Sequence, residues 1–400
     1  MYLSGAFVSN IGSWMQSTAL GWLVLQLTGS AGLLGLISAI STAPVLLLSL
    51  YAGVLADRLD RRRLLSASQI AQGAFAALLA LLTMAHVVQY WQIAVIALAA
   101  GIAQALASPA FQAIVPALVG REAVGNAIAL NSAQFNLSRV IGPVVAGVLI
   151  GLVGEATSFW LNAASFGAVV FVLSRIRLPP DAALERVEQS LWGHLLDGLE
   201  YVRRQRLLLV LVLLAAVPTT FVLPYLTLLP VFAANVLDIG APGLGLLTAA
   251  MGSGALCGAL SVAVLRPGGG DGRLMLAGLA VLIVAVAGFA LSSSVAVSCV
   301  ALAIAGAAQV WYYTSANTLV QLLSPGRLRG RILSLYVLTS FGVTPIGSLW
   351  AGSVAQVRGA PVALIVGCVA AVACALVAIV STPGLLSLHG EPLRARVHAV

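Results

Sequence analysis

The stretch GVLADRLDRRRLL, residues 53–65, places four arginines and two aspartates in thirteen residues of a chain that is only 8% charged. It separates two long apolar runs, one ending near residue 55 and the other beginning near residue 64. Of the 400 residues, 60% are hydrophobic, well above the roughly 45–50% of soluble domains. A short charged turn between long apolar runs is typical of a loop between membrane-spanning helices. We therefore expect a polytopic membrane protein.

The other apolar runs have the length of membrane-spanning helices. A helix crosses the hydrocarbon core with about 20 residues, and these runs do not alternate as the strands of a membrane barrel would. The sequence predicts an all-α integral membrane fold with twelve transmembrane helices. The predicted spans lie near 3–27, 31–55, 64–85, 91–115, 127–152, 156–174, 207–235, 243–265, 274–292, 295–321, 331–355 and 361–381.

One long polar stretch divides these spans into two sets of six. We expect a six-helix N-terminal half at 1–174, a cytoplasmic linker at 175–206, a six-helix C-terminal half at 207–381 and a cytoplasmic tail at 382–400. The linker contains SLWGHLLDGLEYVRRQR, whose pattern predicts an amphipathic helix. VGREAVGNAIAL and SPGRLRGRILSL enter the fifth span of each half in a similar way. Such repeats are typical of alternating-access transporters, whose substrate site lies between the repeats.

The arginines set the expected orientation. The loops after every second span, together with the C-terminal tail, hold 18 of the 20 arginines. Cytoplasmic loops carry an excess of basic residues, so both termini are expected in the cytoplasm and the protein in the inner (plasma) membrane. The first span shows no signal-peptide pattern. Because the positive charge has this topological explanation, we expect no nucleic-acid partner.

The opening stretch resembles a known signature, the loop motif G-x-L-a-D-r-x-G-r-r of the major facilitator superfamily. The matching residues are Gly53, Leu55, Asp57, Arg58, Arg61 and Arg62, whereas Asp60 replaces the second glycine of the motif. The resemblance implies that this set, apart from Leu55, is a conformational latch that holds the outward-open state. Asp57 is expected at a helix end, where it can meet the positive N-terminus of a neighbouring helix. The alternative is that the arginines only set the topology.

A second motif lies in the fifth span. RVIGPVVAG, residues 139–147, resembles the antiporter motif of exporters in the same superfamily. Pro143 removes a backbone donor, and Gly142 and Gly147 allow close helix packing; an ordinary helix kink is the alternative. The fourth span lacks the arginine that many proton-coupled drug exporters carry there. Taken over nearly the whole chain, the sequence is similar to the branch that includes macrolide-efflux proteins and enterobactin exporters.

Arg139 is expected near the membrane midplane, where a cation is functional by default. We interpret it as a group that attracts an anionic or oxygen-rich substrate; the alternative is a structural partnership with backbone carbonyls or with Gln134 and Asn136. Spans 1, 4, 7 and 10 line the central cavity of the superfamily fold. The resemblance therefore implies a substrate cavity that includes Asn10, Trp14, Gln104, Gln134, Arg139, Tyr225, Gln309, Tyr313 and Asn317. For each polar residue, interhelical hydrogen bonding is an equal alternative.

The function that agrees best with these sequence features is secondary export of an amphipathic small molecule, siderophore-like or drug-like. Proton coupling stays open, because no acid or histidine is expected at midplane; Asp57, Glu122 and Asp238 are the candidates. We expect no catalytic residue, metal or cofactor. The expected partners are the substrate, membrane lipids and, with coupling, protons, with the chain acting as a monomer. A lipid or lysolipid flippase of the same fold and a membrane-embedded enzyme are the alternatives.

Overall fold

The computed structural model describes the chain except for residues 1, 59, 119–123, 176–190, 266–270, 387 and 389–400. Secondary structure in the described part is helical throughout. Contacts divide the chain into two compact units. Unit 1 comprises Met1–Val187 and Leu229–Ala249, and unit 2 comprises Glu188–Leu228 and Ala250–Val400. The expected six-helix halves, linker and tail stay predictions; residues 176–190 of the linker and 389–400 of the tail lie outside the described residues.

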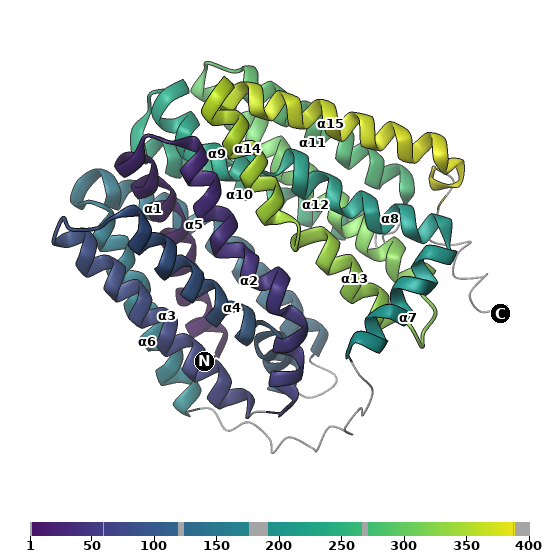
Figure 1. Ribbon diagram of the computed structural model, residues 1–400, viewed down its shortest axis with the longest axis horizontal. Coiled ribbons are helices and arrows are strands. Elements are labelled where there is room, and N and C mark those ends of the chain that lie inside the picture. The colour runs from purple at the N-terminus through teal and green to yellow at the C-terminus, as the bar shows by residue number, and fades with distance from the viewer. Residues whose placement is uncertain are drawn as a thin grey trace. The chain divides into compact units, whose positions relative to one another are not determined.

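Unit 1 is built from six long helices, with the end of α9 (Tyr225–Val231), the π-helix η3 (Phe232–Val236) and the start of α10 (Gly240–Leu265) packed with them. Within it, α3 lies beside α6, and α1 packs against both α5 and α6 (Figure 1). The six helices are α1 (Tyr2–Thr28), α2 (Ala31–Arg58), α3 (Arg61–Met84), α4 (Tyr90–Ala117), α5 (Val124–Val153) and α6 (Glu155–Arg175).

Unit 2 holds the rest of α9 and α10 and begins with α7, the expected amphipathic linker helix. In this unit α11 packs along both α12 and α15. Its other elements are α7 (Leu191–Arg204), α8 (Arg206–Val217), the π-helix η2 (Pro218–Val222), α11 (Gly272–Leu291), α12 (Val295–Leu323), α13 (Arg329–Phe341), α14 (Thr344–Arg358), α15 (Ala360–Ser381) and the 3-10 turn η4 (Pro383–Leu385).

The predicted spans correspond to these helices. Eleven helical segments of the described chain are long and apolar enough to cross a membrane, from 18 residues at Ala31–Leu48 to 31 residues at Arg206–Val236. The helix α1 is not among them, although it is 27 residues long. Its polar residues, including Asn10 and Gln16, lower its hydropathy. The predicted all-α membrane fold is confirmed, and α1 is the helix that completes the expected set of twelve.

Two predicted spans are interrupted. The span near 207–235 is divided into α8, η2, α9 and η3, where Leu223 N donates to Pro218 O at 2.7 Å across a π-turn. Prolines interrupt the regular hydrogen-bond ladder because they lack an N–H, and single π-turns often mark functional segments. The span near 331–355 breaks at Gly342, between α13 and α14.

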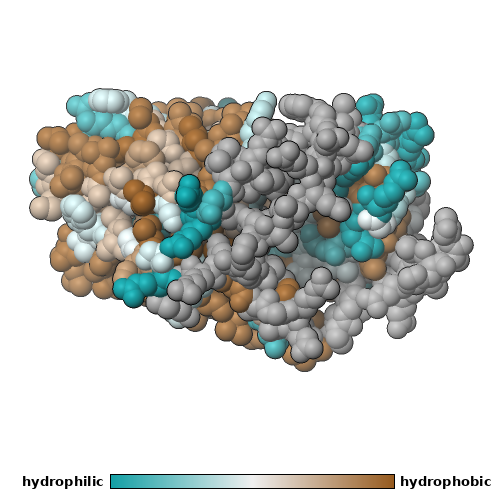
Figure 2. Space-filling view, turned by 90° about the horizontal axis from the view of Figure 1, so that it is seen from below, coloured by the Kyte–Doolittle hydropathy of each residue, from teal (hydrophilic) through white to brown (hydrophobic). Residues whose placement is uncertain are grey.

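Helix ends that the orientation prediction places on one side of the membrane are joined by hydrogen bonds. Arg62 Nη2, at the start of α3, donates to Ser174 O near the end of α6 at 2.8 Å. In unit 2, Arg331 Nη1 of α13 is 2.5 Å from Asp197 Oδ2 of α7. Figure 2 shows hydrophilic side chains in separate patches beside apolar surface. Arg62 and Arg331 therefore lie near the starts of their helices, and apolar side chains cover much of the face in Figure 2.

Candidate functional site

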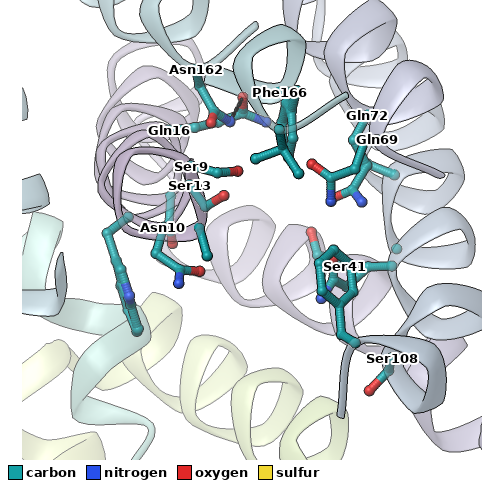
Figure 3. A pocket seen from close by; sticks show the side chains of 18 of the residues that line it. Ser9, Asn10, Ser13, Gln16, Ser41, Gln69, Gln72, Ser108, Asn162 and Phe166 are labelled. Carbon is teal, nitrogen blue, oxygen red and sulfur yellow. Dashed lines mark hydrogen bonds between the residues drawn. The ribbon is translucent and has the colours of Figure 1, made fainter. Parts of the chain in front are cut away.

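A cavity of about 590 Å³ lies inside unit 1 and is lined by residues from all six of its long helices (Figure 3). The described residues that line it include no acid, arginine or histidine. Its polar groups are hydroxyls and side-chain amides; the amides belong to Asn10, Gln16, Gln69, Gln72, Gln104, Asn131, Gln134 and Asn162. The wall is therefore uncharged but rich in donors and acceptors of hydrogen bonds.

One group of amides connects α1 to α5. Asn10 Nδ2 donates to Gln134 Oε1 at 3.2 Å, and Gln134 Nε2 donates to Asn131 Oδ1 at 3.2 Å. Each of these amides still has hydrogen-bonding capacity beyond these contacts, because a side-chain amide offers two donors and an acceptor with two lone pairs. This group fixes the position of one cavity wall and leaves polar atoms for a ligand.

A second group connects α1 to α6. Asn162 Nδ2 donates to Gln16 Oε1 at 2.7 Å, and Ser165 Oγ donates to Asn162 Oδ1 at 3.1 Å. The helices approach closely here, because a Cβ built on Gly12 lies 2.6 Å from both Asn162 Oδ1 and Ser165 Oγ. Glycine is needed at this position so that the amide of Asn162, only 1% exposed, can reach Gln16.

The third group belongs to α3. Gln72 Nε2 donates to Ser68 Oγ at 3.0 Å, and Ser68 Oγ donates to Ala103 O of α4 at 2.8 Å. Gln69 is 3% exposed, and its Oε1 is buried without a hydrogen-bond partner among the described residues. A buried polar atom without a partner carries a free-energy cost of about 1–3 kcal/mol. Among the described residues that line the cavity, Gln69 is thus the one with a buried side-chain oxygen that has no hydrogen-bond partner.

Aromatic and aliphatic side chains together form the apolar part of the wall. Trp14 and Phe135 meet edge to face, with ring centroids 6.1 Å apart, and Phe166 is 5% exposed. Arg139 does not line the cavity; its guanidinium carbon lies 5.6 Å from the centroid of the Trp14 ring. This is a cation–π arrangement. The interpretation of Arg139 as a substrate-attracting group stays a prediction.

The structure therefore brings together four of the predicted cavity residues: Asn10, Trp14, Gln104 and Gln134. The remaining four besides Arg139 belong to unit 2. Tyr225 is fully buried there, Gln309 is half-buried, the hydroxyl of Tyr313 is hydrogen-bonded to that of Thr219, and Asn317 accepts from Gln321. Their role in substrate binding stays a prediction.

The two motifs of the sequence are described to different extents. The side chains of Gly53, Asp57, Arg58 and Arg61 lie outside the described residues, and of the predicted latch only Arg62 is described. The glycines of the fifth-span motif lie at close helix contacts. A Cβ on Gly142 lies 2.6 Å from Trp14 Cβ, and a Cβ on Gly147 lies 2.8 Å from Ala241 O. Small residues at such points let backbones approach.

Sequence reasoning missed Gln69, Gln72 and Asn162 as cavity residues. Amides inside apolar spans were the available signal, since a polar group in a membrane helix needs a partner or a polar cavity. The predicted cavity included residues from spans 1, 4, 5, 7 and 10 only, whereas these three amides lie in the third and sixth spans. The cavity inside unit 1 is lined most by α1, but α3 and α6 also contribute polar residues to it.

A multi-pass helical membrane protein with an uncharged polar cavity among its helices has the form of a solute transporter. A family model described as transmembrane secretion effector matches residues 3–388. The chain belongs to this family and to the major facilitator superfamily of transporters. It is a transporter and not an enzyme, and the predicted resemblance is confirmed.

Characterised relatives carry transport names. The multidrug efflux pump Tap of Mycolicibacterium fortuitum is 27% identical over 368 residues, covering 90% of this chain and 89% of Tap. The staphyloferrin A transporter of Staphylococcus aureus is 30% identical over 188 residues, covering 46% of this chain and 47% of that protein.

Solved structures share the fold. A bacterial homolog of the human lysosomal transporter Spinster matches with a TM-score of 0.74 at 16% identity, covering 96% of both chains. A D-xylose–proton symporter matches with a TM-score of 0.72 at 14% identity, covering 94% of this chain and 97% of the symporter. At these identities the likeness concerns the fold alone.

Proposed function

We propose that this protein is a secondary active exporter that moves an amphipathic small molecule, siderophore-like or drug-like, out of the cytoplasm by alternating access. The observation that best supports the proposal is the cavity of unit 1, whose wall combines amides and hydroxyls with the rings of Trp14 and Phe166. Pockets of this size, apolar with a few placed polar groups, suit drug-sized ligands. The names of the multidrug pump and the staphyloferrin transporter agree with such substrates.

Among the described residues, no side chain that lines the cavity is suited to carry a coupling proton. No described lining residue is ionisable in the physiological range, so proton coupling requires a group elsewhere in the chain. Asp57 and Glu122 have side chains outside the described residues, and Asp238 lies in the turn before α10. We propose that Asp57 acts with the neighbouring arginines as a latch, and that coupling, where present, uses one of these three acids.

Reconstituted vesicles test the proposed export. Vesicles that contain the purified protein and are loaded with a fluorescent, uncharged amphipathic dye are expected to release it several-fold faster than protein-free vesicles when a pH gradient is imposed. Collapsing the gradient with an ionophore separates coupled export from a passive leak. If dye release equals that of protein-free vesicles while a labelled phospholipid changes leaflet, the protein is a flippase and the export proposal is wrong.

We propose that the protein lies in the plasma membrane as a monomer. In the proposed orientation both termini are in the cytoplasm. With the four native cysteines replaced, His86→Cys and Asp238→Cys are expected to react with an impermeant maleimide added to intact cells. Arg204→Cys and Arg329→Cys are expected to react only after the cells are opened, because arginine-rich loops stay inside. Reaction at position 204 in intact cells without reaction at 238 would show that the orientation is the opposite of the proposed one.

Size-exclusion chromatography with light scattering measures the mass of the purified protein and so tests whether it is a monomer.

A further inference from the structure

We infer that the cavity of unit 1 binds an uncharged, hydroxyl-rich part of the transported molecule, such as a sugar-like ring, and not its charged part. The inference rests on the proposed function, because it assigns a ligand chemistry to the site where export substrates are proposed to bind. Three features of the cavity carry it: the charge of the wall, the incomplete hydrogen bonding of Gln69, and the placement of polar and aromatic groups around the space.

The wall offers nothing to compensate a ligand charge. The described lining residues carry no ionisable acid, arginine or histidine. The cation nearest along α5, Arg139, is held over the Trp14 ring at 5.6 Å and is not among the lining residues. A charge that leaves water for an uncharged cavity is strongly destabilised unless it is paired. Neutral polar groups are the class that this wall can accept.

Gln69 specifies hydrogen bonding to the ligand. Its side chain is 3% exposed, lines the cavity and has a buried Oε1 without a partner among the described residues. An aliphatic ligand leaves this group unsatisfied. A hydroxyl both donates and accepts, so it satisfies the amide of Gln69 whichever way the amide is turned. The neighbouring amide of Gln72 lies three residues further along α3, on the same helix face.

The arrangement of groups suits a ring with a polar rim and apolar faces. Figure 3 shows Gln69 and Gln72 pointing into the cavity from one side, with Ser9 and Ser13 of α1 on the other side. Phe166 presents an aromatic surface between them. The hydroxyls of a sugar-like ring can meet the amides and serines while its C–H faces contact the aromatic ring.

Three para-nitrophenyl compounds that each carry a six-membered ring test this ligand class. Binding to the purified protein in lipid nanodiscs is measured by calorimetry with para-nitrophenyl β-glucoside, the corresponding glucuronide and para-nitrophenyl cyclohexyl ether. The glucoside is expected to bind at least about fivefold more tightly than either of the others, the effect of about one net hydrogen bond. Tighter binding of the glucuronide overturns the inference and supports attraction by Arg139. Equal binding of the cyclohexyl ether also overturns it, because the hydroxyls then contribute nothing.

Gln69→Met keeps the length of the side chain and removes its polar atoms. We expect this variant to bind the glucoside about fivefold less tightly, while the melting temperature of the ligand-free protein stays the same or rises, because an unsatisfied buried group is lost. Gln205→Met, at an exposed position before α8 where the side chain makes no capping hydrogen bond, is the control and is expected to change neither. Unchanged glucoside affinity in Gln69→Met overturns the role of Gln69 in the inference.

The vesicle assay separates this inference from the proposed function. If the wild-type protein releases the dye but fails to bind the glucoside, export stands and the ligand class is wrong. If the glucoside binds with the expected dependence on Gln69 while no dye is released in any gradient, the ligand class stands and the proposed export is wrong.

Discussion

Replacing Gly142 by valine is expected to abolish transport and to lower thermal stability strongly. A Cβ at this position lies 2.6 Å from Trp14 Cβ and 2.8 Å from Ile11 O, so α1 and α5 have to move apart. Overpacking typically lowers the free energy of unfolding by about 1–3 kcal/mol. A loss at or above the upper end of this range is expected here, because the contacted atoms include backbone atoms, which cannot turn aside. Displacing α1 also displaces Trp14 and Asn10, which line the cavity. The melting temperature and vesicle transport measure the two effects.

Gly167→Val is the matched control for this prediction. Gly167 also lies in the interior of a helix of unit 1, α6, but nothing is within 4 Å of a Cβ built on it. It is expected to cost nothing in stability, because valine has a higher helix propensity than glycine, and to keep transport. If Gly142→Val melts and transports as Gly167→Val does, the close approach of α1 and α5 is not required.

The same reasoning gives the fifth-span motif a physical meaning. A Cβ on Gly147 lies 2.8 Å from Ala241 O and 3.0 Å from Gly245 Cα, and a Cβ on Gly245 lies 2.7 Å from Pro143 O. The start of α10 thus packs on α5 through glycines from both helices. A kink alone would not require glycine on the partner helix. The motif is explained by close packing on both sides of α5.

The helices were predictable because membrane burial leaves a strong signal. The span predicted near 31–55 is α2, Ala31–Arg58, and the span predicted near 156–174 is α6, Glu155–Arg175. Hydropathy over about 20 residues is enough for this, because lipid requires every spanning segment to be helical and apolar. The π-turns at Pro218 and Phe232 could not be predicted from it, because an interrupted apolar helix has the same composition as a continuous one.

The cavity was only partly predictable. Trp14 and Asn10 were expected from their span, and both line the cavity. Gln69 and Asn162 were not, because side chains inside a six-helix bundle meet through the rotation of each helix about its axis, which hydropathy does not report. Arg139 shows the same limit: depth in the membrane was inferred from its place in the sequence, but its stacking on Trp14 depends on how α1 and α5 face each other.

Ser13→Phe is expected to block transport while the protein stays folded, and so it tests whether the cavity of unit 1 is the substrate site. Ser13 of α1 lines the cavity opposite Gln69 and Gln72 and is only partly buried (Figure 3), so the ring enters existing space. Binding and transport are expected to fall at least about tenfold, a loss of about 1.4 kcal/mol. The control Val95→Phe adds the same ring on α4, where the side chain is 59% exposed and outside the lining; transport is expected to persist. Because both variants add a phenyl ring to a membrane helix, equal transport by the two at equal melting temperature places the substrate outside this cavity.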